Sequence, residues 1–305
     1  MTAANDEAMA GRFLPRDMRV LIQGMTGRMG RHHTKLMRAY GTNIVAGVAP
    51  KSTDRECDGI AVFRNCGDAV AASGAVASVA MVPPTETLTA IFDAVEGGLK
   101  LIVTVAEGMP VADAVRALHA VRAAGVRWIG PSTPGLAVPG LYKLGFLPDV
   151  SMAPGPLFIM SKSGTLSYEV CHRLVNVGIG QSAWVGVGGD AVKGTRFADL
   201  VPYSLADEET RAIVVIGEIG GGDEEELAAE LIATGCRKPV YALIAGSTAR
   251  DGVTMGHAGA IVHGNVGTFG SKRDALTSAG ARVFERIQDL VDAVTGQLAN
   301  KTGEI

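Results

Sequence analysis

Short continuous apolar runs rich in valine and isoleucine alternate along this chain with longer segments of helical character. Apolar runs without polar alternation indicate strands buried on both faces, as in a parallel sheet covered by helices. In the first half we expect strands within residues 18–24, 43–50, 77–84, 99–108 and 126–135, and helices at Arg28–Tyr40 and Glu86–Gly97. This half therefore predicts a doubly wound parallel sheet.

The second half repeats the plan. We expect strands within residues 155–164, 182–189, 211–221 and 238–246, and helices at 164–177, 223–235 and 287–298. A span rich in proline and glycine, Pro131–Pro156, marks the predicted domain boundary. The pattern predicts an α/β protein with a tail at 1–17, a first domain at 18–150 and a second at 151–305.

Composition narrows the class of protein. Hydrophobic residues make up 47% of the 305-residue chain and charged residues 19%, and the net charge of −3 favours neither nucleic acid nor an anionic membrane as a partner. No apolar run is long enough to span a bilayer, and the first seventeen residues do not form a secretory signal. The four cysteines form no CxxC pair, so we expect a cytoplasmic protein with reduced thiols and no metal site.

The first strand-to-helix junction reads GMTGRMGR, residues 24–31. A glycine-rich turn of this kind brings backbone N–H groups to a pyrophosphate at the positive end of a helix. NAD, NADP, FAD and coenzyme A all fit such a turn. The GRMG segment also resembles the cofactor loop of dihydrodipicolinate reductases, so a nicotinamide enzyme is one alternative.

The end of the second strand separates these ligands. An NAD-binding fold places Asp or Glu there to hold the ribose hydroxyls, whereas this chain has Lys51, with Arg55 shortly after it. A cation suits a phosphorylated ribose, as in NADP or coenzyme A. An ordinary surface lysine is the alternative.

A second anion-ready turn lies in SKSGTLSYE, residues 161–169. Ser163, Gly164 and Thr165 stand between a strand and a helix, where N–H groups and hydroxyls can hold a phosphate. The alternative is a helix cap without a ligand.

A third loop carries His257 between glycines, in TMGHAGAIVHG. A phosphoryl-accepting imidazole needs space, one free ring nitrogen and a partner for the other nitrogen. Glu218, which ends a strand and is followed by glycines, is the expected partner. A satisfied loop histidine and a helix-start acid are the alternatives.

Seven segments together resemble the α subunits of succinyl-CoA synthetases, within the acid–CoA ligase superfamily: GMTGRMG, VTVAEGMP, GPSTPG, SKSGTLSYE, VGVGGDAVKGTRFADL, IGEIGG and MGHAGAIV. The resemblance runs from Met18 to the C-terminus. It implies a Rossmann-like coenzyme A-binding domain followed by a flavodoxin-like ligase domain. It also implies a β subunit with an ATP-grasp fold, which would bind ATP or GTP and Mg²⁺.

The resemblance further implies roles for individual residues. A carboxylate is activated as an acyl phosphate, coenzyme A attacks it, and His257, held by Glu218, carries the phosphoryl group. The matching coenzyme A contacts are Thr26, Gly27, Arg28, Met29, Val105, Ala106 and Glu107. Tyr168 matches the tyrosine that contacts the substrate, and Ser163 and Gly164 match the phosphate cradle.

Two loops depart from the family pattern. The family's TPGKGG is APKSTD here, with Lys51 one place early, and its GPNCPG is GPSTPG, with Ser132 and Thr133 beside the acyl site. The second change argues against assuming succinate, and malate–CoA ligases share the same motifs. A coenzyme A-binding or partner-binding protein without ligase activity and an NADP-dependent reductase are the alternatives of other classes.

Two further groups receive no catalytic role. The stretch DEEELAAE is expected to be a solvated helix face, and His263 is expected to be an ordinary loop histidine.

Overall fold

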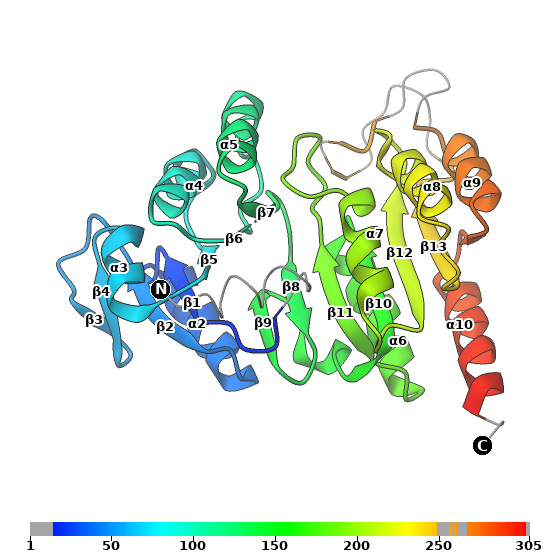
Figure 1. Cartoon of the computed structure of the whole chain (residues 1–305), viewed down its shortest axis with the longest axis horizontal. Coiled ribbons are helices and arrows are strands. Elements are labelled where there is room, and N and C mark those ends of the chain that lie inside the picture. The colour runs from blue at the N-terminus through cyan, green and yellow to red at the C-terminus, as the bar shows by residue number, and fades with distance from the viewer. Residues whose placement is uncertain (1–14, 249–255, 258, 262–266, 303–305) are drawn as a thin grey trace. The chain divides into compact units, whose positions relative to one another are not determined.

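The computed structural model describes residues 15–248, 256–257, 259–261 and 267–302 (Figure 1). The chain divides into two compact units, residues 1–147 with 186–195 and residues 148–185 with 196–305. The predicted tail at 1–17 lies mostly outside the described residues, which begin at residue 15. The segment 186–195, which falls within the predicted second domain, groups with the first unit.

The sheet of the first unit has the strand order β3-β4-β2-β1-β5-β6-β7. All its pairings are parallel except that of β3 with β4. Its strands are β1 (Val20–Gln23), β2 (Ile44–Val48), β3 (Glu56–Cys57), β4 (Ile60–Phe63), β5 (Ala77–Ala80), β6 (Leu101–Thr104) and β7 (Arg127–Ile129). Because the chain moves from β1 to β2 on one side and later to β5 on the other, β1 marks the topological switch point, where ligands bind in such sheets.

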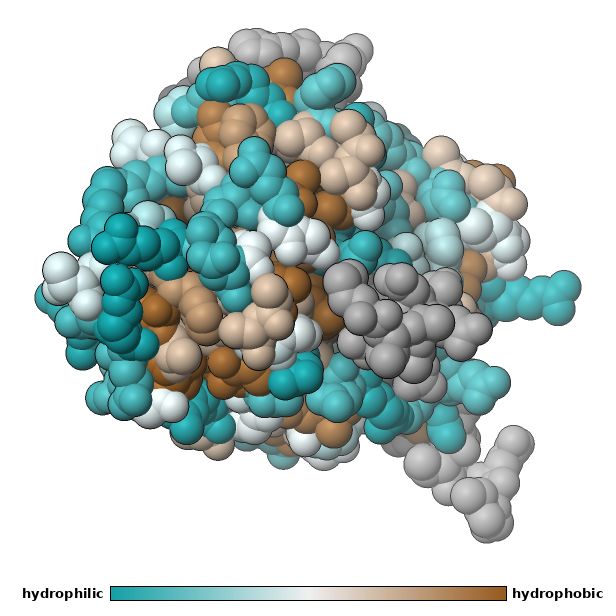
Figure 2. Space-filling model, turned by 60° about the vertical axis from the view of Figure 1, so that its left-hand side comes forward, coloured by the Kyte–Doolittle hydropathy of each residue, from teal (hydrophilic) through white to brown (hydrophobic). Residues whose placement is uncertain are grey.

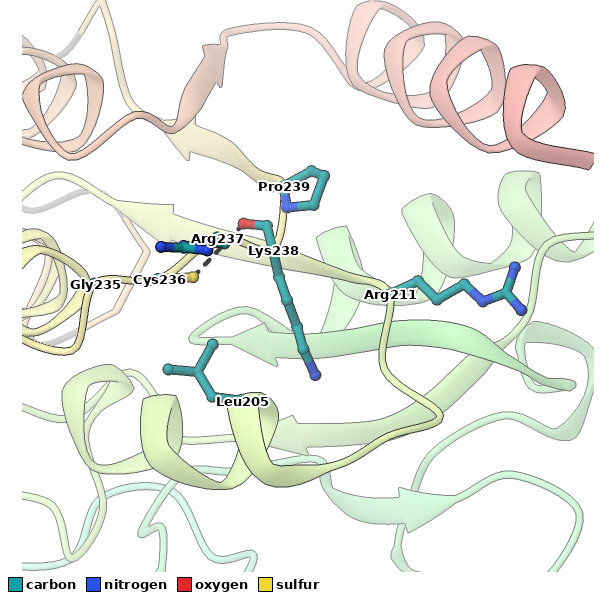
Figure 3. A pocket seen from close by; sticks show the side chains of 7 residues that line it. All are labelled: Leu205, Arg211, Gly235, Cys236, Arg237, Lys238 and Pro239. Carbon is teal, nitrogen blue, oxygen red and sulfur yellow. Dashed lines mark hydrogen bonds between the residues drawn. The ribbon is translucent and has the colours of Figure 1, made fainter.

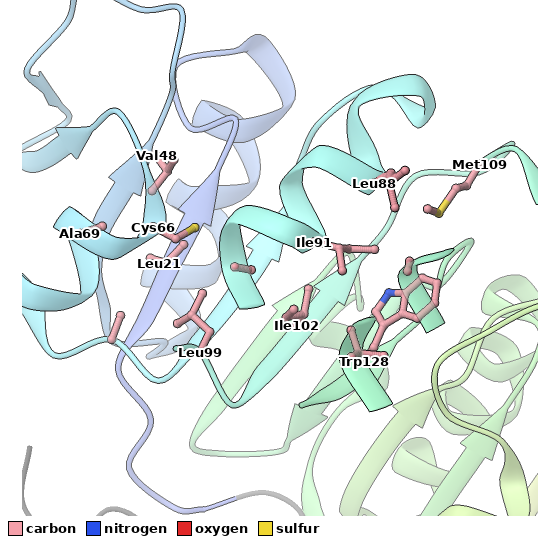
Figure 4. Close-up of a cluster of buried hydrophobic side chains, with 14 of the residues drawn as sticks. Leu21, Val48, Cys66, Ala69, Leu88, Ile91, Leu99, Ile102, Met109 and Trp128 are labelled. Carbon is pink, nitrogen blue, oxygen red and sulfur yellow. The ribbon is translucent and has the colours of Figure 1, made fainter. Parts of the chain in front are cut away.

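The helices of this unit are α2 (Arg28–Tyr40), α3 (Cys66–Ser73), α4 (Thr87–Glu96) and α5 (Val111–Ala123), with a 3₁₀ turn, η1 (Pro84–Glu86). Strand and helix side chains form a buried cluster, drawn in Figure 4, that includes Leu21, Ile91, Ile102 and Trp128. Leu21, Ile91 and Ile102 are fully buried and Trp128 is 1% exposed. This packing fixes the strand ends from which the site loops leave.

An antiparallel hairpin of β8 (Gly135–Val138) and β9 (Tyr142–Gly145) follows β7. It packs against α2. Just after α2, the Thr42 hydroxyl donates to the carbonyl oxygen of Lys143 at 2.7 Å. The sequence pattern did not predict the hairpin, because its strands are short and lie within the proline- and glycine-rich span.

In the second unit the strands run in the order β14-β13-β12-β10-β11. They are β10 (Pro154–Ser161), β11 (Gln181–Gly186), β12 (Ala212–Glu218), β13 (Val240–Ala245) and β14 (Arg282–Phe284). The helices are α6 (Gly164–Asn176), α7 (Phe197–Ala206), α8 (Asp223–Ala233), α9 (Phe269–Ser278) and α10 (Ile287–Thr302), with a 3₁₀ turn, η2 (Asp149–Ser151). The chain leaves β10 toward β11 and returns to β12 on the other side, so the switch point lies between β10 and β12.

The predicted fold class, two mostly parallel α/β sheets, is confirmed. The sequence pattern did not predict the strands β3, β4 and β14 or the helices α3, α5, α7 and α9. No helix among the described residues is long and apolar enough to cross a membrane. On the face drawn in Figure 2, hydrophobic residues lie in groups among hydrophilic ones.

Candidate functional site

The turn between β1 and α2 presents an open helix N-terminus. Gly27 is the N-cap residue, no side chain caps this end, and the first turn of α2 contains no acidic residue. The Gly27 N–H donates to the carbonyl oxygen of Gly24 at 3.1 Å, which closes the turn. An uncapped N-terminus without carboxylates favours an anion, because the first N–H groups of a helix have no partner within the helix.

A cavity of about 670 Å³ lies next to this turn. It is lined by Gln23, Gly24, Thr26, Gly27, Val48, Ala49, Pro50, Lys51, Ser52, Arg64, Met81, Val82, Pro83, Glu86, Thr89, Ala90 and Asp93. Three residues of the predicted coenzyme A set, Thr26, Gly27 and Lys51, are among them. The other five, Arg28, Met29 and Val105–Glu107, are not.

The cavity wall contains a polar atom suited to a ligand. The Gln23 amide donates to the carbonyl oxygen of Ala90 at 2.7 Å, whereas its buried Oε1 has no hydrogen-bond partner within the described part of the chain. Because a buried acceptor without a partner is costly, a donor on a bound molecule would stabilise this wall. The residues present thus fit a ligand that combines a phosphate with hydrogen-bonding groups.

Lys51 lies at the edge of the cavity. Its side chain is 84% exposed and its Nζ lies 2.6 Å from Oε1 of Glu86. The neighbouring loop is tied to the turn by Arg31, which donates to the carbonyl oxygen of Thr26 and to Asp54, both at 3.0 Å. Lys51 thus forms an ion pair with Glu86, an acid that the sequence pattern did not identify.

The loops that follow β6 and β7 meet each other. The Ser132 N–H donates to the carbonyl oxygen of Ala106 at 3.0 Å. The Thr133 hydroxyl donates to the carbonyl oxygen of Gly186 at 2.5 Å and accepts the Gly135 N–H at 2.9 Å, and the residue is 3% exposed. Thr133 is thus engaged within the protein, and half-buried Ser132 is the more available of the two hydroxyls.

In the second unit, the loop after β10 begins helix α6. The Ser163 hydroxyl accepts the Leu166 N–H at 3.3 Å, so Ser163 is the N-cap of α6. Gly164 and Thr165 are the next two residues, and their N–H groups have no partner within the helix by position. The first turn of α6 contains no acidic residue, which leaves this end suited to an anion.

Tyr168 lies one turn further along α6. It is half-buried, and its ring packs edge-on against that of Trp184 with 5.9 Å between centroids. Burial raises the pKa of the Tyr168 hydroxyl, which keeps it protonated and able to donate a hydrogen bond.

His257 and Glu218 are brought together from positions 39 residues apart, with 2.7 Å between Nδ1 and Oε2. Because a carboxylate only accepts hydrogen bonds, Nδ1 carries the proton, and in the neutral ring Nε2 keeps a lone pair. The Glu218 side chain is 10% exposed and that of His257 is 28% exposed. The imidazole is therefore oriented by a nearly buried carboxylate and remains accessible.

The glycines after Glu218 allow the histidine loop to approach. Gly220 has φ +86°, and a Cβ added there would lie 2.2 Å from the carbonyl oxygen of Gly259. The Gly220 N–H also donates to the carbonyl oxygen of Gly267 at 2.7 Å. His263, to which the sequence analysis gave no role, lies outside the described residues.

A group of charged residues that the sequence pattern did not identify lies next to this pair. Asp223 and Glu224, in the stretch predicted to be a solvated helix face, are 6% and 0% exposed, so that prediction is wrong for both. They face Lys162 and Lys272, which are also buried. Lys162, Asp223 and Glu224 each lie within a few residues of a predicted strand end, whereas Lys272 lies 26 residues after the last one and carried no such signal.

A second hollow, of about 430 Å³, lies where β12 and β13 begin, and Figure 3 shows the residues that line it. Lys238 crosses this hollow and donates to the carbonyl oxygens of Ser204 and Asp207, both at 2.7 Å. Arg211 and Arg237 point to opposite sides of it. Lys238 thus caps the C-terminal end of α7, and the cations do not converge on a ligand.

Comparison with known proteins gives two family matches. The CoA binding domain family matches residues 15–108, and the CoA-ligase family matches residues 160–282. The first match covers the turn before α2 and the cavity, and the second covers the α6 cap, Glu218 and His257.

Curated relatives match along nearly the whole chain. The succinate–CoA ligase [ADP-forming] subunit alpha 1 of Archaeoglobus fulgidus is 45% identical over 90% of this chain and 94% of its own length. The corresponding alpha subunit of Methanothermobacter thermautotrophicus is 43% identical over 94% of this chain and 97% of its own.

Solved structures share the fold at lower identity. An ATP citrate lyase from Methanothrix soehngenii, in complex with citrate and coenzyme A, matches with a TM-score of 0.81 and 21% identity over 94% of this chain. A Ca. Korarchaeum cryptofilum acetyl-coenzyme A synthetase matches with a TM-score of 0.74 and 21% identity over 90% of this chain. This chain spans 51% and 59% of those two chains. Identity and coverage among the curated relatives establish that this chain belongs to the family of succinate–CoA ligase α subunits.

Proposed function

We propose that this chain is the α subunit of a nucleotide-dependent acid–CoA ligase and that His257 carries the phosphoryl group. The observation that carries the proposal is the 2.7 Å contact between His257 Nδ1 and Glu218 Oε2, in a histidine whose side chain is 28% exposed. Together with a β subunit, the chain joins a carboxylate to coenzyme A. Succinate is the first substrate to test, since the relatives carry its name.

The chemistry follows from the oriented imidazole. Nε2 attacks the terminal phosphorus of the nucleoside triphosphate, and the bond to the leaving diphosphate breaks. The ring then carries positive charge, which the Glu218 carboxylate stabilises through Nδ1–H. The N-terminal end of α6, at Gly164 and Thr165, favours the phosphoryl anion. Magnesium and the nucleotide are held by an ATP-grasp β subunit in this proposal.

Transfer to the carboxylate completes the cycle. A carboxylate oxygen displaces Nε2 from phosphorus, which gives an acyl phosphate and restores the neutral imidazole. The thiolate of coenzyme A then attacks the acyl carbon, and inorganic phosphate leaves. Tyr168 is the hydroxyl group of the second unit proposed to orient the carboxylate, and Glu107 belongs to the proposed coenzyme A contacts of the first unit.

Coenzyme A is proposed to bind the first unit. The cavity beside the α2 turn fits its phosphates and adenosine, with Thr26, Gly27, Arg28 and Met29 at the turn and Lys51 at the edge. Val105 and Ala106 belong to the loop that accepts the Ser132 N–H. This loop is the proposed position of the reacting thiol.

Ser132 and Thr133 depart from the family's GPNCPG pattern, which is the reason to test malate as the second substrate. Because the Thr133 hydroxyl is engaged with Gly186 and Gly135, the hydroxyl of Ser132 is the group left to contact an additional polar substituent on the acid. Thioester formation measured with succinate, malate, citrate and acetate decides between them.

Phosphorylation is tested with the complex of this chain and its β subunit. After incubation with γ-³²P-ATP or γ-³²P-GTP and Mg²⁺, we expect an acid-labile label on the α chain that is discharged by succinate and coenzyme A. His257→Asn removes the label, whereas His119→Asn, at an exposed helical position, keeps it. A label that persists in His257→Asn contradicts the proposed role. Coenzyme A binding without any label supports a non-catalytic binding protein, and nicotinamide binding to the chain supports a reductase.

A further inference from the structure

A cluster of buried charges lies directly beneath Glu218, formed by Lys162, Glu224 and Lys272. Their side chains are 4%, 0% and 0% exposed. Lys162 Nζ lies 2.9 Å from Glu224 Oε1, and Lys272 Nζ forms an ion pair with Glu224 Oε2. Buried charges of this kind are stable only when paired, so Glu224 is the common anion of two buried cations.

Glu224 also contacts the backbone of the proposed site. Its Oε1 accepts the N–H of Glu218 at 3.1 Å. Gly217, which precedes Glu218, is needed for this approach, because a Cβ added there would lie 2.5 Å from the same oxygen. Figure 1 shows α8, which carries Glu224 in its first turn, beside the end of β12.

Lys162 is a second cation that interacts electrostatically with Glu218. Burial by itself would lower the pKa of Lys162, but the carboxylates of Glu224, Asp223 and Glu218 together raise it. Glu218 therefore has two neighbours that compete for its carboxylate, the ammonium group of Lys162 and the Nδ1–H of the His257 imidazole. Glu224, with Asp223 at 3.3 Å, occupies the Lys162 ammonium.

The same lysine connects the cluster to the phosphate turn. Lys162 directly precedes Ser163, the N-cap of α6, and its N–H donates to the carbonyl oxygen of Ile216 in β12 at 2.9 Å. Lys162 therefore joins the two sides of the switch point, through its backbone N–H to β12 and through its ammonium group to Glu224, which follows β12.

We propose that Glu224 is a positioning residue: by occupying Lys162 and Lys272 and holding the Glu218 backbone, it leaves the Glu218 carboxylate to His257 and fixes the imidazole with its proton on Nδ1. The catalytic consequence rests on the proposed function, because only a phosphoryl carrier needs Nε2 unprotonated. Removing the Glu224 charge leaves Lys162 with the more distant carboxylate of Asp223 and Lys272 with that of Glu225, so the Lys162 ammonium competes more strongly for the Glu218 carboxylate.

The test measures the tautomer of His257 in the full-length chain by long-range ¹H–¹⁵N NMR with ¹⁵N-labelled histidine. His257→Asn identifies the signal among the six histidines. We expect the Nδ1–H form to dominate in the wild type and the Nε2–H form to dominate in Glu224→Gln. Glu226→Gln, the same change at an exposed position of α8, is the matched control and keeps the wild-type tautomer.

A second variant separates competition from loss of folding. In Lys162→Met/Glu224→Gln the competing cation is absent and Lys272 keeps Glu225, 3.5 Å away, so we expect the Nδ1–H form to return. An unchanged tautomer in folded Glu224→Gln overturns the proposal. Failure of the double variant to restore the Nδ1–H form, where Glu224→Gln has lost it, also overturns it.

Phosphorylation of the complex gives an independent reading. In Glu224→Gln we expect the rate of labelling to fall by about tenfold to a hundredfold, by analogy with the loss when the partners that orient metal-binding histidines are removed. Because the tautomer is measured without phosphorylation, a chain that is never labelled but changes tautomer as expected contradicts the proposed function and leaves the positioning role supported.

Discussion

Removing Lys272 from its buried ion pair is expected to destabilise the second unit by a measurable amount. Lys272→Met keeps most of the apolar stem and removes the ammonium group, while Glu224 stays fully buried. Breaking a buried pair by removing one partner costs about 3–5 kcal/mol, because the other charge is left uncompensated. Glu224 retains Lys162 at 2.9 Å, so we expect a loss near the lower limit, about 3 kcal/mol.

The two tryptophans allow the loss to be assigned to one unit. Trp128 is buried in the first unit and Trp184 in the second. In a Trp128→Phe background, urea unfolding followed by Trp184 fluorescence reports the second unit, and a Trp184→Phe background reports the first. Urea is suitable because it is uncharged and does not screen ion pairs. We expect Lys272→Met to lower the free energy of unfolding reported by Trp184 by about 3 kcal/mol and to change the value reported by Trp128 less.

A double-mutant cycle tests the physical reason. If the cost arises from an uncompensated carboxylate, Lys272→Met together with Glu224→Gln costs less than the sum of the single changes, by about 1–3 kcal/mol. Single effects that add within about 0.5 kcal/mol would refute this reasoning, because they would mean that the two side chains contribute independently.

Three further outcomes are expected. Gly220→Ala should lower the free energy of unfolding by about 1–3 kcal/mol, measured by thermal unfolding, because the added Cβ overpacks the loop, and it should also slow phosphorylation. Gly222→Ala, where an added Cβ meets no atom within 4 Å, should change neither, and equal effects of the two changes would contradict the role of the close approach at Gly220. Burial, followed by the charges of two neighbours, lowers the pKa of His33, so the unfolded chain binds the proton first and the free energy of unfolding should fall as pH drops below about 6.5. This part of the fall should be missing in His33→Phe, and parallel pH curves for the two proteins in urea unfolding would contradict it. Lys51→Ala should weaken coenzyme A binding by no more than about fivefold in calorimetry, because the Lys51 ammonium is exposed and already paired with Glu86. A loss of about tenfold or more would mean a stronger contact than the structure indicates.

The local pattern was sufficient to predict the main strands and the anion-ready turns. Unalternating apolar runs such as those in β1, β6 and β12 identify buried parallel strands, since both faces of such strands are covered. Glycine and serine at the ends of β1 and β10 predicted the turns before α2 and α6. The short strands β3 and β14 and the β8–β9 hairpin carry too little pattern of their own and depend on pairing with neighbours.

Burial of charge could not be predicted from the sequence. The stretch DEEELAAE has the composition of a solvated face, yet Glu224 is buried because Lys162 and Lys272 arrive from distant parts of the chain to neutralise it. The roles of Ser132 and Thr133 were equally open, and the contact of Thr133 with Gly186, 53 residues away, distinguished them.

The sequence by itself determined the fold class, the family motifs and the identity of the residues available for chemistry, because these depend on local periodicity and residue type. Only the tertiary structure decided which of those residues meet. It placed the Glu218 carboxylate on His257 and put Glu224 between two lysines beneath it, since both arrangements depend on strand ends being adjacent in the sheet rather than along the chain.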